Sequence, residues 1–154
     1  MKKISILILS FLIITGIWGC SDNEVRSVPK SEPYTSEEAI RRGDIVSIEK
    51  IYNLDKFEQF INNISSKKAD QIRVTSYTDE GDPIFKDLKF DGSLISYSYD
   101  TSNDEFGGSN TGVRTDTCSV VGSTENTQGE IIYSISGCTN INPEIDYYLL
   151  RTTK

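Results

Sequence analysis

The feature that most constrains the fold is a change of apolar periodicity near Asp70. Apolar residues recur every three or four positions before Asp70 and every second position after it. The first spacing lines one face of a helix, and the second lines one face of a strand. Helices followed by strands indicate an α+β domain with a mainly antiparallel sheet of about six strands. Strands are predicted near residues 72–78, 84–90, 93–99, 113–121, 129–137 and 147–152.

Two helices are predicted before the strands. Thr35 and Glu38 have the spacing of a capping box, which begins a short helix that ends at Gly43. A longer helix begins at Asn53 and is expected to keep two lysines in its last turn. These lysines are Lys67 and Lys68.

The longer helix carries an apolar stripe that matches one face of the predicted sheet. The stripe consists of Leu54, Phe57, Phe60, Ile61 and Ile64. The matching sheet residues are Ile72, Val74, Leu88, Phe90, Ile95, Tyr97 and Tyr99. Because an amphipathic helix buries its apolar face, we expect these two surfaces to form the core.

Two turns determine the expected strand register. A two-residue hairpin at residues 91–92 would pair Phe90 with Ser93. A looser turn before Ile84 would pair that residue with Thr78. In this register the apolar residues of three strands share one face, which a slip of one residue would destroy.

Residues 1–19 have the form of an export signal, with two lysines followed by an apolar run at residues 4–14. The run is shorter than the roughly 20 residues that span a bilayer. Residues 17–20 resemble a lipobox, in which the cysteine receives a diacylglycerol and becomes the first residue of the mature chain. Trp18 departs from the small residue usual there. A plain secretory signal and an uncleaved anchor fit less well.

The domain organisation follows from this signal. We expect Cys20 to carry the lipid that holds the protein on the extracytoplasmic face of the cell membrane. Residues 20–34 are polar, include two prolines and have no apolar period, so they are predicted to be a flexible tether. Residues 35–154 are predicted to form a single extracytoplasmic domain.

The mature chain is acidic. Removal of the two signal lysines leaves 16 minus 2, or 14, cationic residues against 23 anionic ones, a net charge of minus 9. Such a domain is repelled by nucleic acid and by anionic lipid headgroups. We therefore expect no nucleic-acid partner and a covalent rather than electrostatic contact with the membrane.

The other two cysteines, Cys118 and Cys138, are predicted to form a disulfide, because disulfides persist outside the cytoplasm. Pairing them across a hairpin would place Val121 opposite Ile135. A redox-active pair is the alternative, but such cysteines are usually two residues apart at a helix start.

The chain has no histidine, which excludes histidine-dependent triads, bases and metal sites. Ser65 and Lys68 have the spacing of a Ser-x-x-Lys pair, but they lie at a predicted helix end. Two acidic loops are weak candidates for a calcium site. Their residues are Asp79, Asp82, Asp100 and Asp104. The second loop has Glu105 and Thr111 where a calcium loop needs glycine and glutamate, so solvated turns are the default interpretation.

Several blocks of the sequence are similar to a known group of proteins. They are EAIRRGDIV (residues 38–46), IYNLDKF (51–57), IRVTSYT (72–78), GDPI (81–84), DEFGG (104–108) and the final cysteine pair. They resemble a group of small uncharacterised lipoproteins of Gram-positive, spore-forming bacteria, known as a domain of unknown function. The resemblance covers residues 35–154 and implies the location and the fold, but no activity or catalytic residue.

Together these features predict a membrane-anchored surface lipoprotein with a non-catalytic binding or interaction domain. Its partner would be an unknown protein or another component of the cell envelope, and no cofactor is expected. Two alternatives stay open. A carboxylate-dependent hydrolase would need two acids held together in a cleft, one with a raised pKa. A calcium-binding lipoprotein would use the acidic loops.

Overall fold

The computed structural model describes residues 30–153, so the predictions for the export segment and for Cys20 lie outside the described residues. The helices are α1 (Ser36–Arg42), α2 (Leu54–Ser65) and the short 3-10 helix η1 (Gly108–Asn110). The strands are β1 (Ile45–Ser47), β2 (Ile51–Tyr52), β3 (Asp70–Tyr77), β4 (Pro83–Phe90), β5 (Ile95–Asp100), β6 (Val113–Cys118), β7 (Val120–Glu125), β8 (Glu130–Ser136) and β9 (Tyr148–Thr153).

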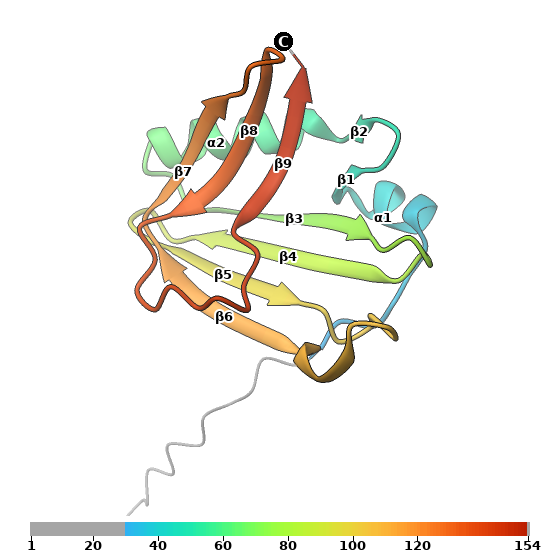
Figure 1. The fold of residues 1–154 in the computed structure, drawn as a ribbon. Coiled ribbons are helices and arrows are strands. Elements are labelled where there is room, and N and C mark those ends of the chain that lie inside the picture. Colours follow the sequence, from blue (N-terminus) through green and yellow to red (C-terminus); the bar gives the residue numbers. More distant parts are fainter. Residues whose placement is uncertain (1–29, 154) are drawn as a thin grey trace, which may run out of the picture.

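The strands form two sheets rather than the single sheet of about six strands that was predicted. The larger sheet has the order β2-β1-β3-β4-β5-β6, and the smaller has the order β7-β8-β9. Strand β1 runs parallel to β3, and the other neighbouring pairs are antiparallel. The α+β class is therefore broadly confirmed. In Figure 1 the strands of the smaller sheet run steeply across those of the larger one, and α2 lies beside them.

The predicted strand at residues 113–121 is split between the two sheets. Cys118 pairs with Ile95, which is the first residue of β5, so the larger sheet offers no partner beyond this point. The backbone N–H of Ser119 instead donates to Ser136 of β8 at 3.2 Å. Strand β7 then follows β8 with Val121 opposite Ile135, as the cysteine pairing predicted.

Both hairpin registers differ from the prediction by two residues. Phe90 pairs with Ile95, and Ile84 pairs with Ser76. The turn between β4 and β5 has four residues, because the carboxylate of Asp91 accepts two following backbone N–H groups at 2.8 Å. Since side chains alternate with a period of two, this shift leaves every residue on its predicted face.

Both predicted helices form. The hydroxyl of Thr35 accepts the backbone N–H of Glu38 at 3.3 Å, and α1 ends at Gly43, where φ is +92°. Helix α2 ends at Ser65, so Lys67 and Lys68 follow the helix instead of forming its last turn. The reason is the left-handed backbone of Lys67, with φ +54°, which closes the helix end.

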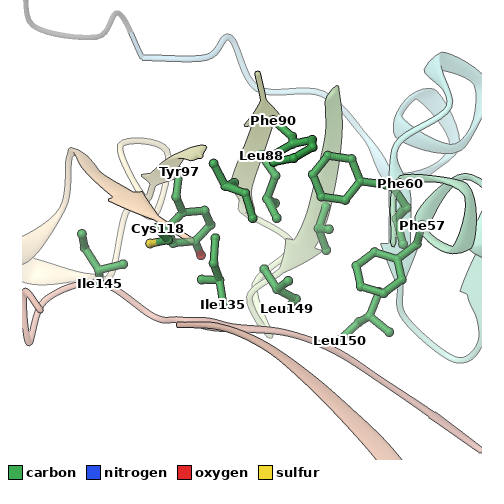
Figure 2. Close-up of a cluster of buried hydrophobic side chains, with 13 residues drawn as sticks. Phe57, Phe60, Leu88, Phe90, Tyr97, Cys118, Ile135, Ile145, Leu149 and Leu150 are labelled. Carbon is green, nitrogen blue, oxygen red and sulfur yellow. The ribbon is translucent and has the colours of Figure 1, made fainter. Parts of the chain in front are cut away.

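The predicted helix stripe and sheet face form the core. Phe57 and Phe60 of α2 are buried against the larger sheet, and β9 adds Leu149 and Leu150 (Figure 2). The ring of Phe57 meets that of Tyr133 edge-on, at 5.0 Å between centroids. Helix α2 and the smaller sheet therefore share one face of the larger sheet, and its other face carries Arg73 and Asp87.

Candidate functional site

A groove of about 520 Å³ lies where the N-terminal residues and α1 meet β3 and β4. We call it the Arg73 groove. Its charged lining residues are Arg42, Asp44, Lys56, Arg73, Asp87 and Lys89. Four of these are cationic and two are anionic, although the whole chain has a net charge of minus 7. The groove is therefore a locally basic surface on an acidic protein.

Arg73 lies opposite Asp87 in the β3–β4 pair, and the two side chains form a bidentate ion pair. Nε and Nη2 of Arg73 each donate to a carboxylate oxygen of Asp87 at 2.6 Å. The guanidinium also donates to the hydroxyls of Tyr34 and Ser31, both at 3.1 Å. These hydrogen bonds, chiefly those to Asp87, raise the pKa of Arg73 above its ordinary value. Arg73 is thus a permanent cation held in one position.

Tyr34 links Arg73 to a second carboxylate. Its hydroxyl accepts from Arg73 and donates to Oδ2 of Asp44 at 2.6 Å. The hydroxyl of Thr75 donates to the same oxygen at 2.7 Å, and Asp44 is only 7% exposed. Burial, together with Asp44, raises the pKa of Tyr34 despite the opposing effect of Arg73. The groove floor is therefore a continuous hydrogen-bonded chain whose members already have partners.

The other three cations extend from the rim of the groove. Arg42 pairs with Glu38 at 2.7 Å, and its guanidinium lies 4.3 Å from the centre of the Tyr34 ring. Nζ of Lys56 donates to the carbonyl of Gly43 at 3.2 Å. Among residues 30–153, no ion pair or hydrogen bond engages the side chain of Lys89, which is exposed. Lys56 and Lys89 can therefore reorient toward an incoming anion at little cost.

The predicted disulfide is present. Cys118 and Cys138 are joined with an S–S distance of 2.04 Å. Within the described part of the chain, these two sulfurs and the Asp116 carboxylate form the one group of close metal-type ligand atoms. Because both sulfurs are bonded to each other, they are not thiolate ligands in this state.

The structure brings the two acidic loops together without converging their carboxylates. Oδ2 of Asp82 accepts the backbone N–H of Glu105, in the second loop, at 3.0 Å. Asp100 accepts backbone N–H groups of Ser31 and Ser102, at 2.7 and 2.9 Å. Asp104 accepts that of Phe106 at 3.1 Å, while Asp79 lies exposed in the turn between β3 and β4. Three of the four carboxylates therefore accept backbone N–H groups within the fold. Calcium binding stays a prediction.

Asp116 is a buried carboxylate that the sequence did not single out. It accepts hydrogen bonds from the hydroxyls of Thr139 and Tyr147, both at 2.8 Å. Burial raises the pKa of Asp116, but these bonds, with those from the backbone, outweigh it and lower the pKa overall. Asp116 therefore fastens the segment that joins β8 to β9 onto the edge strand β6.

Lys86 is a second buried charge. It is 4% exposed and donates to the Asp146 carboxylate and to the Tyr148 carbonyl, both at 2.6 Å. Burial lowers the pKa of Lys86, with Asp146 partly opposing the effect. Since these partners lie in or just before β9, Lys86 ties the larger sheet to the smaller one.

Among residues 30–153, the two carboxylates of the Arg73 groove do not form the close pair of acids that a hydrolase would need. In the Arg73 groove, Asp44 and Asp87 are separated by the Tyr34 hydroxyl and the Arg73 guanidinium. The described carboxylates with clearly shifted pKa values are Glu37, Asp91 and Asp116, and all three shift downward. A general acid requires the opposite shift.

Comparison with known protein families gives a match. A family described as "Domain of unknown function (DUF4362)" matches residues 42–134, which is more than half of the chain. This range contains Arg42, Asp44, Lys56, Arg73, Asp87 and Lys89. No curated protein and no solved structure matches the chain.

Proposed function

The chain belongs to the DUF4362 family of domains of unknown function, and from this premise we propose that it is a lipid-anchored binding protein of the cell envelope. In this proposal the Arg73 groove receives an anionic group, such as a carboxylate or phosphate, of an envelope component or of a partner protein. The domain binds its partner and does not transform it.

The sequence supports the location. A cationic start and a short apolar run precede Cys20, which stands where a lipobox places the lipid-bearing cysteine. The disulfide between Cys118 and Cys138 suits an oxidising compartment outside the cytoplasm. None of the helices among residues 30–153 is long and apolar enough to cross a membrane.

The observation that carries the proposal is the excess of cations in the Arg73 groove. Asp87 already neutralises Arg73, and Glu38 pairs with Arg42, so the two lysines provide the charge available to a ligand. Lys56 and Lys89 are both exposed. Binding should therefore be weak, specific for anions, and reduced by salt, because exposed charges are screened within about 10 Å at 0.1 M ionic strength.

The experiment titrates the mature chain in detergent with inorganic pyrophosphate and follows backbone amide shifts by NMR. Each exposed cation contributes about 0.5–1 kcal/mol. The double variant Lys56→Gln/Lys89→Gln should therefore weaken binding by about five- to thirtyfold. Lys50→Gln is the matched control, because Lys50 is an exposed lysine outside the groove. Equal affinities of the double variant and the control would refute the groove as the binding site.

The hydrolase alternative finds no support in the shifted carboxylates of residues 30–153. It requires a carboxyl group with a raised pKa beside a second acid, whereas the shifted carboxylates all have lowered pKa values. The calcium alternative rests on the acidic loops alone. Isothermal titration of the mature chain with calcium chloride tests it independently of the groove.

A further inference from the structure

The loop of residues 101–112, between β5 and β6, presents an aromatic side chain to solvent. Phe106 is 74% exposed. Apart from Ile141, the other exposed large hydrophobic residues among residues 30–153 are only 41–47% exposed. Phe106 therefore leaves most of its ring unburied in this domain.

The loop is held in shape by its own hydrogen bonds, so the exposure of Phe106 is a feature of an ordered segment. At its base, the N–H of Thr101 donates to the Gly112 carbonyl at 3.0 Å, and the N–H of Gly112 donates to the Thr101 hydroxyl at 3.1 Å. Near the tip, the N–H of Phe106 donates to the Asp104 carboxylate at 3.1 Å. A closed loop of this kind presents a side chain without paying further ordering entropy on contact.

The chain begins its path through the domain beside this same loop. The N–H of Ser31 donates to Asp100 at 2.7 Å, and the side chain of Asn103 donates to the Ser31 carbonyl at 2.9 Å. Figure 1 shows the blue N-terminal segment running from α1 to the region of η1. Eleven residue steps separate Cys20 from Ser31, and a fully extended chain spans about 3.5 Å per residue. A lipid on Cys20 thus keeps Ser31 within about 39 Å of the bilayer.

We propose that the Phe106 loop is the membrane-facing tip of the domain, and that the Phe106 ring rests at the boundary between the headgroups and the acyl chains of the bilayer as a second contact beside the lipid anchor. This inference rests on the proposed lipid anchor. A single ring does not hold a free protein on a membrane, but a tethered ring acts at a high effective concentration.

The charges near the tip limit which surface the loop can approach. Asp104 and Asp82 turn their carboxylates back to loop N–H groups, at 3.1 and 3.0 Å, yet they still repel an anionic surface. The contact is therefore apolar rather than electrostatic, and a neutral bilayer is the appropriate probe.

The test uses tryptophan as a depth probe. The chain has one tryptophan, Trp18, which cleavage at Cys20 removes, so Phe106→Trp gives the mature lipoprotein a single indole. The mature lipoprotein is reconstituted into phosphatidylcholine vesicles, with and without brominated acyl chains that quench indole on contact. Leu94→Trp is the matched control, because Leu94 is 44% exposed at the opposite end of β5.

Brominated lipid should reduce the fluorescence of Phe106→Trp at least twofold and leave that of Leu94→Trp unchanged. Equal fluorescence of Phe106→Trp with and without bromine, or equal quenching of both variants, overturns the inference. Flotation of the vesicles and the intact mass of the chain are measured in the same samples. Protein that carries lipid and floats without quenching refutes this contact alone, whereas protein without lipid that fails to float refutes the anchor and the contact together.

Discussion

Truncation of Phe57 should remove a contact between α2 and the smaller sheet. Phe57 is 1% exposed, and its ring meets that of Tyr133 edge-on at 5.0 Å. The substitution Phe57→Ala therefore removes a buried ring and an aromatic pair at the place where α2, the larger sheet and the smaller sheet meet.

The expected loss in the free energy of unfolding follows from the buried ring and from the aromatic pair. Phe→Ala in a core costs about 3–5 kcal/mol, of which an edge-on aromatic pair accounts for about 0.5–1.5 kcal/mol. Phe57→Leu keeps most of the apolar volume and should lose about 1–1.5 kcal/mol. The free energy of unfolding of a domain is about 5–15 kcal/mol. Phe57→Ala should therefore leave the folded protein only marginally stable.

The assay is urea unfolding of the mature chain with the disulfide intact. With an m-value of about 1.5–2 kcal/mol per M, Phe57→Ala should lower the midpoint by about 1.5–3 M and Phe57→Leu by less than 1 M. Glu58→Ala is the control, because Glu58 is exposed on the same helix. If Phe57→Ala keeps the wild-type midpoint, the helix stripe does not form the core and the reasoning from periodicity is refuted.

Two further predictions concern the disulfide and alkaline pH. The double variant Cys118→Ala/Cys138→Ala opens a link with a sequence separation of 20 and should lose about 3 kcal/mol in the same assay; two alkylatable thiols in unreduced, denatured wild-type protein would show that the link is absent. Burial raises the pKa of Tyr77 to about 12, while the pKa of an unfolded tyrosine is about 10. The stability that the protonated Tyr77 contributes is therefore complete below pH 10 and is lost as the pH rises to about 12. The urea midpoint should therefore fall between pH 10 and pH 12, and less steeply in Tyr77→Phe; equal slopes would count against this cause.

The faces of the strands could be predicted from the sequence because they depend only on alternation. The registers of the two hairpins differ from the prediction, yet Leu88 and Tyr97 still lie in the core that contains α2, since each shift is by two residues. The exact register could not be obtained, because it depends on how the Asp91 carboxylate binds the turn backbone. The same sequence could form turns of different length, and these side-chain bonds select one of them.

The division into two sheets could not be predicted from local pattern. Residues on both sides of Ser119 have strand-forming character, and only the length of β5 shows that the larger sheet ends at Cys118. The cysteine pair did predict the β7–β8 register, because a covalent link between distant residues is long-range information.

The Arg73 groove escaped prediction because its members come from separate segments. Tyr34, Asp44 and Arg73 meet only after β1, which follows α1, pairs with β3. A signal was present in the sequence. Arg73 and Asp87 are charged residues within predicted strands, at positions that point away from the apolar face, and opposite charges at such positions indicate a cross-strand pair.

The central claim is that this domain works outside the cytoplasm while held by lipid on Cys20. The most direct measurement is the intact mass and membrane association of the wild-type chain and of Cys20→Ala in the producing bacterium. The wild-type chain should begin at Cys20, carry acyl mass and sediment with membranes. Cys20→Ala should accumulate as a precursor that retains residues 1–19 and carries no acyl mass. A Cys20→Ala chain that is processed and membrane-bound like the wild type would contradict the account.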